Sequence, residues 1–229
     1  ETMRTVLHDP DFQELEATWR GLRDLVDALD PDEAVSVQLV DVSRGELLAD
    51  LAACAGDATT SAAHRLLARG CGSGADAEPW SLLVGHFTFG ADLDDLELLG
   101  HLGAIAAHAG APLLAAAAPS LVGCAGLEDR PDPRQWAIAD ATVAQRWDDL
   151  RRGPAARWIG LLLPRILLRL PYGAGTDAIE TFRFEELTPS ATHEDCLWGN
   201  PALACARAIG AAWRSDATAT TVDGPLEID

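Results

Sequence analysis

The chain contains one glycine-rich sequence of the kind that binds dinucleotides. Gly70, Gly72 and Ala75 fit the pattern G-x-G-x-x-A. In a dinucleotide-binding fold, this pattern follows a strand and opens a helix. Here it follows a helix predicted at residues 61–68 and precedes a strand predicted at residues 80–87, which is the reverse order. We therefore predict a connecting loop at this position and no cofactor.

Two further groups have side chains that could bind a metal ion. The acidic run at residues 92–97 (DLDDLE) offers carboxylates, but it also opens an apolar periodic segment. An N-cap aspartate and first-turn acids stabilise a helix at such a position, and we favour that interpretation. His101 and His108 are seven residues apart, whereas metal-binding pairs on a helix are typically four apart. We therefore predict no metal site.

The composition excludes several classes of function. All 17 basic residues are arginine, so a Walker A lysine and a Schiff-base lysine are absent. The formal net charge of −19 argues against binding to nucleic acid or to anionic membranes. The chain also lacks the motifs G-x-S-x-G and H-E-x-x-H and the cysteine spacing of zinc sites. We predict no catalytic residues, although carboxylate pairs become visible only in three dimensions.

Cysteine usage and hydropathy predict a cytoplasmic protein. The five cysteines are scattered and form no C-x-x-C pair, as expected of free thiols in a reducing compartment. The first residues do not show a basic region followed by an apolar one, so we predict no signal peptide. The apolar block at residues 158–163 is too short to span a bilayer, which needs about 20 such residues. It is a buried strand or a buried helix, and no membrane insertion is predicted.

The stretch at residues 155–173 (AARWIGLLLPRILLRLPYG) combines high apolarity with three arginines, namely Arg157, Arg165 and Arg169. Pro164 should interrupt regular structure, because the residue before a proline is driven towards extended conformations. Buried arginines need partners, so one hypothesis is that Arg165 and Arg169 are anchored by carboxylates. The alternative is that both guanidinium groups extend to water. The candidate partners are Glu185, Glu186, Asp148 and Asp149.

The first part of the chain predicts a helix, a strand and a second helix. Asp9 and Pro10 suit the cap and first position of a helix. An apolar seam with spacings of three and four follows, and we expect Trp19 to be its large buried anchor. Residues 35–42 (VSVQLVDV) predict a strand, and residues 43–46 (SRGE) form a capping box for the next helix. The seam consists of Phe12, Leu15, Trp19, Leu22, Val26 and Leu29.

The rest of the chain alternates helices and strands. Strands are predicted at residues 80–87, 112–118 and 182–187, with a helix at residues 137–151. A final helix follows the Asn200 cap. This order predicts an α/β fold with a mixed sheet flanked by helices. We expect one core domain at residues 1–215 and a carboxy-terminal tail at residues 216–229 that is a possible edge strand.

Several blocks of the sequence, in order, resemble one family. Residues 164–173 match P-R-x-L-x-R-x-P-Y-G, and residues 8–22 (HDPDFQELEATWRGL) resemble another of its signatures. Residues 182–187 (FRFEEL) and 197–200 (LWGN) add two more. The chain thus resembles the large subunit of the type VI secretion contractile sheath, the TssC/VipB/EvpB family. The motif residues that the resemblance marks as assembly candidates are Trp19, Arg20, Gly21, Arg157, Pro164, Arg165, Arg169, Pro171, Tyr172, Gly173, Glu185, Glu186 and Trp198.

The resemblance implies a structural protein that polymerises around an inner tube and contracts to propel it. The implied partners are the small sheath subunit (TssB/VipA-like), an Hcp-like inner tube, the baseplate, an AAA+ recycling ATPase and further copies of the chain. We expect only the core of the large subunit, without the amino-terminal and carboxy-terminal arms of the family. Two alternatives remain at this point: a truncated paralogue that acts as an adaptor or regulator, and an α/β enzyme.

Overall fold

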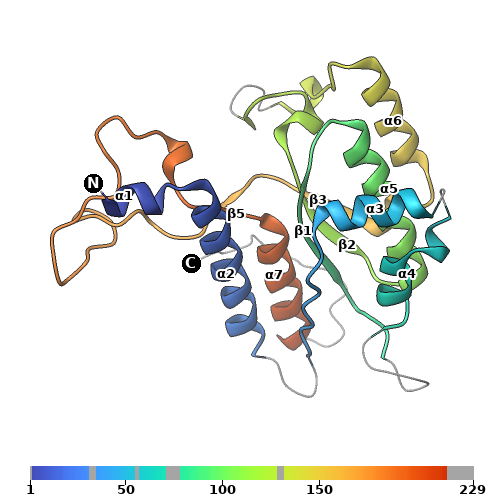
Figure 1. The fold of residues 1–229 in the computed structure, drawn as a ribbon, viewed down its shortest axis with the longest axis horizontal. Helices are drawn as coiled ribbons and strands as arrows, with labels where there is room; N and C mark the ends of the chain where they lie inside the picture. The colour runs from blue at the N-terminus through green and yellow to red at the C-terminus, as the bar shows by residue number, and fades with distance from the viewer. Residues whose placement is uncertain (1, 31–34, 55–56, 71–77, 128–131, 216–229) are drawn as a thin grey trace. The chain divides into compact units, whose positions relative to one another are not determined.

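A computed structural model describes residues 2–30, 35–54, 57–70, 78–127 and 132–215 (Figure 1). The chain divides into two compact units. The first unit combines Glu1–Val35 with Arg165–Asp229, and the second unit is Ser36–Pro164. The predicted domain limit at residue 215 stays a prediction, because the tail at residues 216–229 lies outside the described residues.

The second unit contains a three-stranded parallel sheet in the order β1-β2-β3. The strands are β1 (Leu83–Phe89), β2 (Leu113–Ala117) and β3 (Ile159–Leu162). β2 lies in the middle and is buried along its whole length, as expected of a central parallel strand. The sheet and its helices confirm the predicted α/β class.

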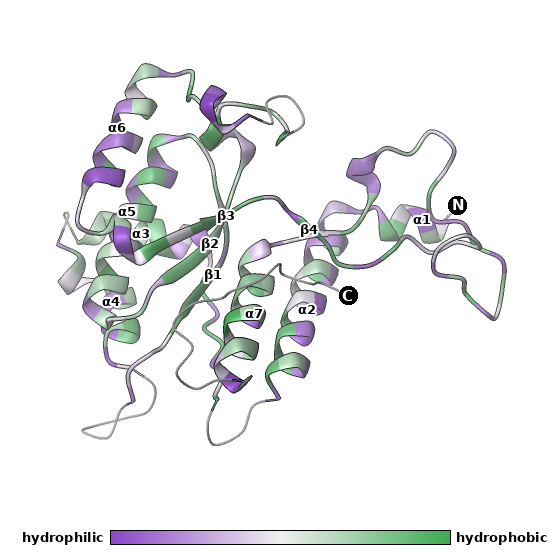
Figure 2. Ribbon diagram, turned by 180° about the vertical axis from the view of Figure 1, so that it is seen from behind, coloured by the Kyte–Doolittle hydropathy of each residue, from purple (hydrophilic) through white to green (hydrophobic). Residues whose placement is uncertain are grey.

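Four α-helices cover one side of this sheet: α3 (Arg44–Ala53), α4 (Ala62–Leu67), α5 (Leu93–Ala109) and α6 (Ala141–Arg152) (Figure 1). Right-handed crossovers between parallel strands in chain order place their connecting helices on the same face. α5 lies at the centre, and its leucines pack on β1 and β2. In Figure 2 the strands and much of α5 are hydrophobic, whereas α6 shows strongly hydrophilic segments. The short 3₁₀ helices of this unit are Ala58–Thr60, Pro119–Val122, Pro133–Gln135 and Ala156–Trp158.

The helix caps of the second unit follow the sequence closely. Ser43 and Glu46 form the predicted capping box of α3. At the start of α5, the Asp92 carboxylate accepts a hydrogen bond from the backbone N–H of Asp95 at 2.8 Å, so the acidic run is a helix cap. Asp95 itself pairs with Arg44 of α3. Gly110 ends α5 in the left-handed conformation, with φ of 70°.

The first unit is built on two parallel-running helices, α2 (Pro10–Leu29) and α7 (Pro201–Ser215). Asp9 caps α2 as predicted, and the Asn200 side chain accepts a hydrogen bond from the Ala202 backbone N–H. Gly21 allows close approach, because a Cβ there would lie 2.8 Å from Leu203 Cδ1. The other elements are α1 (Thr2–Leu7), β4 (Ile166–Leu167), β5 (Trp198–Gly199), which pairs antiparallel with β4, and the 3₁₀ helix His193–Asp195.

The predicted burial of Trp19 is wrong, because its side chain is 61% exposed. α2 packs on α7 through a different stripe, spaced by four residues, in which small residues allow the helix backbones to come close. Leu29 belongs to this stripe as well as to the predicted seam. The buried residues of α2 are Ala17, Gly21, Leu25 and Leu29.

Two predicted strands are also wrong. The described residues 35–42 and 182–187 form no ladder, although their sequences alternate as strands do. Leu39 is 67% exposed. Strand propensity reflects side-chain fit to a pleated surface, whereas a strand also requires a neighbouring edge with matching hydrogen bonds. By contrast, the strands predicted at residues 80–87 and 112–118 are present. The glycine-rich loop falls mainly at residues 71–77, which lie outside the described residues.

His101 should make the stability of the chain depend on pH. This histidine of α5 is 7% exposed, and its Nε2 has no hydrogen-bond partner in the described part of the chain. Burial lowers its pKa, and this effect outweighs the attraction of Asp50. His64, another close histidine, lowers it further. The pKa of a histidine in the unfolded chain is about 6.5. As the pH falls through this value, His101 binds a proton more readily in the unfolded chain than in the folded chain, which favours unfolding.

We therefore expect the free energy of unfolding to decrease from pH 7.5 to pH 5, as measured by urea denaturation. His101→Gln should flatten this part of the profile. His193→Gln is the matched control, because His193 is exposed, and it should leave the profile unchanged. An unaltered slope in the His101 variant would show that other groups cause the pH dependence.

Candidate functional site: a buried arginine–carboxylate cluster

Arg169 lies at the centre of a polar cluster in the first unit. Its side chain is 6% exposed, and that of Glu186 is 1% exposed. The guanidinium donates two hydrogen bonds to Glu186, from Nη1 to Oε2 at 2.6 Å and from Nη2 to Oε1 at 2.9 Å. Such a bidentate pair is among the strongest and most directional polar contacts in proteins. Glu186 is one of the carboxylates that the sequence predicts as a partner of Arg169.

Helix α2 contributes a second carboxylate and a second arginine. Arg169 Nε donates to Glu16 Oε1 at 2.8 Å. Arg20 Nε donates to the same oxygen at 2.8 Å, and its Nη2 reaches the Tyr172 hydroxyl at 3.1 Å. Glu16 and Arg20 are four residues apart, so they share one face of the helix. The cluster therefore contains two arginines and two glutamates.

Tyr172 fixes the remaining side of the cluster. The Arg169 guanidinium carbon lies 4.4 Å from the centre of the Tyr172 ring, within cation–π distance. The Tyr172 backbone N–H donates to Glu186 Oε2 at 2.8 Å, and the Glu186 backbone N–H donates to the Tyr172 carbonyl at 2.8 Å. His8 Nε2 lies 3.8 Å from Glu186 Oε1. The contacts of the cluster therefore tie together three segments of the chain: residues 8–20, residues 169–172 and Glu186.

The electrostatics of the cluster favour the charged forms of Arg169 and Glu16. Burial alone would lower the pKa of Arg169, but its bonds to Glu186 and Glu16 outweigh burial and raise that pKa above its usual value. Burial likewise opposes ionisation of Glu16, yet its hydrogen bonds to Arg169 and Arg20 lower its pKa. Arg169 and Glu16 are therefore both held in their charged forms near neutral pH.

Glu185 holds the turn that follows Tyr172. Its Oε1 accepts a hydrogen bond from the Ala174 backbone N–H at 3.1 Å. A Cβ at Gly173 would lie 2.5 Å from Glu185 Oε2, so glycine leaves room for this carboxylate. The Pro171 carbonyl accepts a hydrogen bond from the Thr176 hydroxyl. The turn at residues 171–173 is therefore held by hydrogen bonds to both Glu185 and Glu186.

Arg165 has a different partner from those predicted. Its guanidinium donates to both carboxylate oxygens of Glu194, at 2.9 and 3.0 Å, and lies 5.4 Å from the Trp198 ring centre. The Arg165 side chain is 52% exposed, so this ion pair is largely solvated. Two of the predicted acids are engaged within α6 instead, where Asp148 accepts from Arg152 and Asp149 accepts from Gln145.

Other motif residues lie outside the cluster. Arg157 belongs to the second unit, where its guanidinium lies 5.7 Å from the centre of the Trp158 ring. Pro164 follows a cis peptide bond. Trp19 is exposed on α2.

Sequence reasoning missed Glu16, Glu194 and His8; the Glu16–Arg20 spacing of four was the one signal that could have indicated Glu16.

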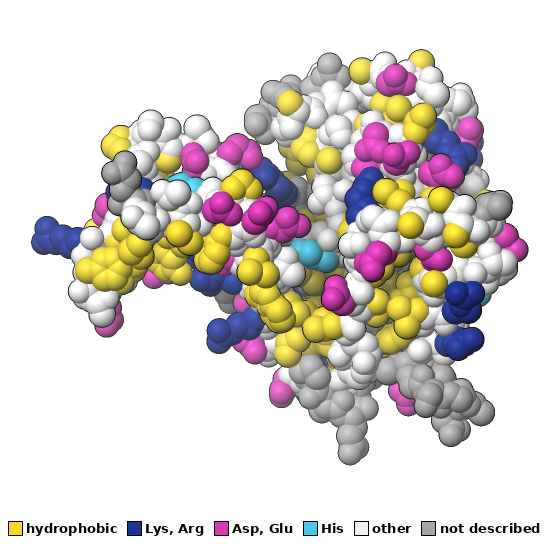
Figure 3. All heavy atoms as spheres, viewed as in Figure 1, with side chains coloured by type: hydrophobic (Ala, Val, Ile, Leu, Met, Phe, Trp, Pro, Cys, Tyr) yellow, Lys and Arg dark blue, Asp and Glu magenta, His cyan; other side chains and the backbone are white. Residues whose placement is uncertain are grey.

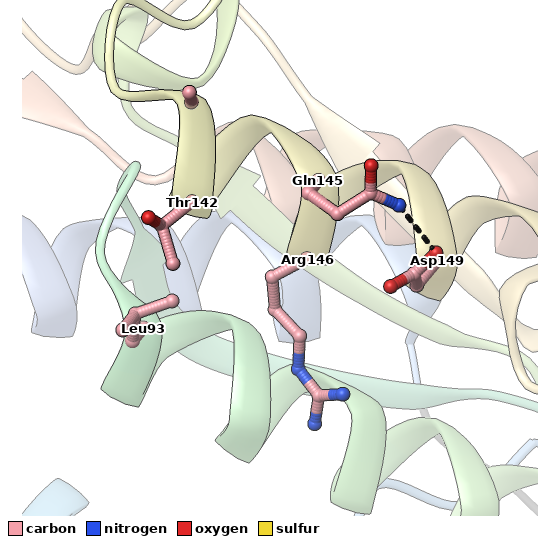
Figure 4. Close-up of a pocket in the computed structure, with 6 residues that line it drawn as sticks. Leu93, Thr142, Gln145, Arg146 and Asp149 are labelled. Atoms are coloured by element: carbon pink, nitrogen blue, oxygen red, sulfur yellow. Dashed lines mark hydrogen bonds between the residues drawn. The ribbon is translucent and has the colours of Figure 1, made fainter.

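The second unit has an open groove between the start of α5 and helix α6, with a volume of about 490 Å³ (Figure 4). In its wall, Gln145 donates a hydrogen bond to Asp149 at 2.9 Å. The groove is lined by Leu93, Ala141, Thr142, Gln145, Arg146 and Asp149.

Among the described residues, no group of three or more histidines, cysteines and acids could hold a metal ion. No helix there combines the length and apolarity needed to cross a membrane.

Comparison with known proteins identifies the family. Residues 1–227 match VipB, described as "EvpB/VC_A0108, tail sheath N-terminal domain". The chain is also 36% identical over 204 residues to the type VI secretion system sheath protein TssC1 of Pseudomonas aeruginosa. That similarity covers 88% of this chain and 41% of the relative, so the chain spans less than half the length of that protein. The chain belongs to the VipB family of tail sheath proteins.

Replacement of Arg169 should strongly destabilise the first unit. Arg169→Ala leaves Glu186 buried without its bidentate partner, and breaking such a pair typically costs about 3–5 kcal/mol. Arg165→Ala removes an exposed pair and should cost no more than about 1 kcal/mol. The measurement is urea denaturation of the two variants and of the parent chain at neutral pH.

Glu186→Gln combined with Arg169→Met provides a further check. Replacing both partners removes the uncompensated charge, so the double variant should be less destabilised than the sum of its single variants. Equal losses from Arg165→Ala and Arg169→Ala would contradict the special role of the buried pair.

Proposed function

We propose that this chain forms the core of a large subunit of the type VI secretion contractile sheath, with residues 1–215 as the core domain. The match of residues 1–227 to the tail sheath domain is the observation that supports this proposal most directly. The similar Pseudomonas protein carries the name of a sheath protein. In this function the subunits polymerise around an inner tube, and contraction of the polymer propels the tube outward.

The chemistry of the first unit supports a mechanical role. Sheath contraction would be a rigid-body rearrangement between subunits, and each subunit must then keep its internal geometry. The contacts of Arg169 with Glu16, Glu186 and Tyr172 hold distant segments in a fixed arrangement. We infer that the motif residues act by positioning contact surfaces and that the protein performs no catalysis.

The proposed partners follow from the sheath function. They are the small sheath subunit (TssB/VipA-like), further copies of the large subunit, an Hcp-like inner tube, the baseplate and an AAA+ recycling ATPase. We propose that assembly takes place in the cytoplasm.

Co-expression of the native reading frame of this chain with the small sheath subunit tests the proposal. We expect hollow tubules in negative-stain electron micrographs, and Arg169→Ala should reduce their number because it weakens the first unit. Arg134→Ala is the matched control for the loss of one arginine, because the Arg134 side chain is 92% exposed and lies outside the motif residues.

Monodisperse particles without tubules, under conditions in which an established sheath pair assembles, would contradict the proposal. Tubules that form without the large subunit would contradict it as well, because the chain would then be dispensable for assembly.

A further inference from the structure

His101 is a buried histidine on the side of α5 that α4 covers. It is 7% exposed, and its Nε2 has no hydrogen-bond partner in the described part of the chain. His108 lies on the same side of α5, because seven residues are close to two helical turns. The ring of His64 in α4 stands edge-on to the ring of His108, with the ring centres 5.1 Å apart. α4 therefore lies along the side of α5 that carries both histidines (Figure 1).

Three groups act electrostatically on the His101 ring: Asp50 of α3, His64 of α4 and Glu97 of α5 itself. Burial opposes protonation of the ring and is the largest effect; His64 opposes it as well, whereas Asp50 and Glu97 favour it. The balance lowers the pKa of His101. Figure 3 shows acidic and basic side chains interspersed over the visible face of the second unit, so no single sign of charge dominates there.

Helix α4 is held to its neighbours by few contacts. It has six residues, none of them buried, and isolated helices shorter than about 12–15 residues are marginal in water. Its first turn depends on Asp50 of α3, whose two carboxylate oxygens accept hydrogen bonds from the backbone N–H groups of Ala62 at 2.8 Å and Ala63 at 2.9 Å. Ala63 and Leu67 pack against the core but are only partly buried.

The other helices around α5 are held more firmly. α3 buries Leu47, which is 4% exposed, and starts with a capping box. α6 places Val143, which is 8% exposed, in the same core. Displacement of α4 alone is therefore the smallest rearrangement that admits water to His101. Local openings of folded proteins take place in such weakly held segments.

The two other histidines of this region do not decide the direction of the effect. His64 and His108 would repel each other when both are protonated, but Asp57 attracts both of them. These opposing interactions act near the surface, where solvent screens them. The coupling between protonation and opening therefore depends on His101, because its burial ends when α4 moves away.

We propose that α4 is a proton-gated flap: acidification releases it from α5, because the His101 ring binds a proton more readily when α4 no longer covers it, while the sheet, α5 and α6 stay folded. An exposed histidine titrates near pH 6.5, so the closed form is favoured above about that pH and opening increases below it. The flap belongs to the second unit alone and does not depend on the sheath function.

Hydrogen–deuterium exchange of the whole 229-residue chain, read by mass spectrometry at pH 7.5 and pH 5, tests the proposal. The exchange rate of each segment, divided by the intrinsic rate of an unprotected chain at the same pH, gives its opening equilibrium. Opening of α4 should increase at least about threefold on acidification relative to that of α6. α6 is the internal reference, because it also packs on α5 and contains no histidine.

His101→Gln should remove this increase, because glutamine does not titrate. His86→Gln is the matched control, since His86 is an exposed histidine of the same unit on β1; it should retain the full increase. Circular dichroism checks that the variants remain folded. If His101→Gln unfolds the chain, His101→Leu replaces it, because leucine suits a buried position and carries no proton.

Three results would overturn the proposal. An equal loss of protection in α4 and α6 would show that acid unfolds the whole unit instead of releasing a flap. Unchanged protection of α4 between the two pH values would show that His101 is not coupled to its opening. An increase that persists in the His101 variant would assign the pH dependence to another group.

Discussion

The buried pair between Arg169 and Glu186 is the contact on which the first unit depends. A carboxylate that is 1% exposed is costly unless a charged donor satisfies it, and Arg169 provides two hydrogen bonds. The same guanidinium also donates a hydrogen bond to Glu16 of α2. The arginine that satisfies Glu186 therefore also fixes the position of α2. A buried ion pair adds little net stability compared with apolar packing. The contribution of the Arg169–Glu186 pair is geometric, because a planar guanidinium can donate to its partners in only a few arrangements.

The second unit is held together by a different kind of contact, namely apolar packing. α5 lies against a parallel sheet whose middle strand, β2, is built of leucine and alanine. The small side chains of β2 allow close contact, and Gly103 of α5 leaves space for Ile159 of β3. Polar contacts are found mainly at the helix starts, where Asp92 and Ser43 act as caps. The two units thus differ in what holds them: a buried ion-pair cluster in the first unit, and a helix packed on a parallel sheet in the second.

Local sequence signals predicted the caps and most helices, because a capping side chain acts within three residues of the backbone group that it binds. The strands at residues 80–87 and 112–118 were predictable for a related reason, since their apolar runs and flanking turns are local. The segments at residues 35–42 and 182–187 were not, because pairing depends on a distant edge. Within the cluster, the need of Arg169 for an acid followed from its apolar neighbours. The involvement of Glu16 did not, because 153 residues separate the two positions.

The error at Trp19 has a physical cause. Hydrophobic periodicity identifies the face of a helix with the largest apolar side chains, and in α2 that face is the seam at Phe12, Leu15 and Trp19. Helix contacts within a chain can instead use small residues, because Gly21 and Ala17 allow α7 to approach closely and gain many weak contacts. The periodic signal therefore indicated the helix correctly, but the face of α2 that packs on α7 is the small-residue stripe and not most of the predicted seam. Hydrophobic periodicity alone therefore does not identify the residues of a helix that pack, because side-chain size decides how closely a neighbour can approach.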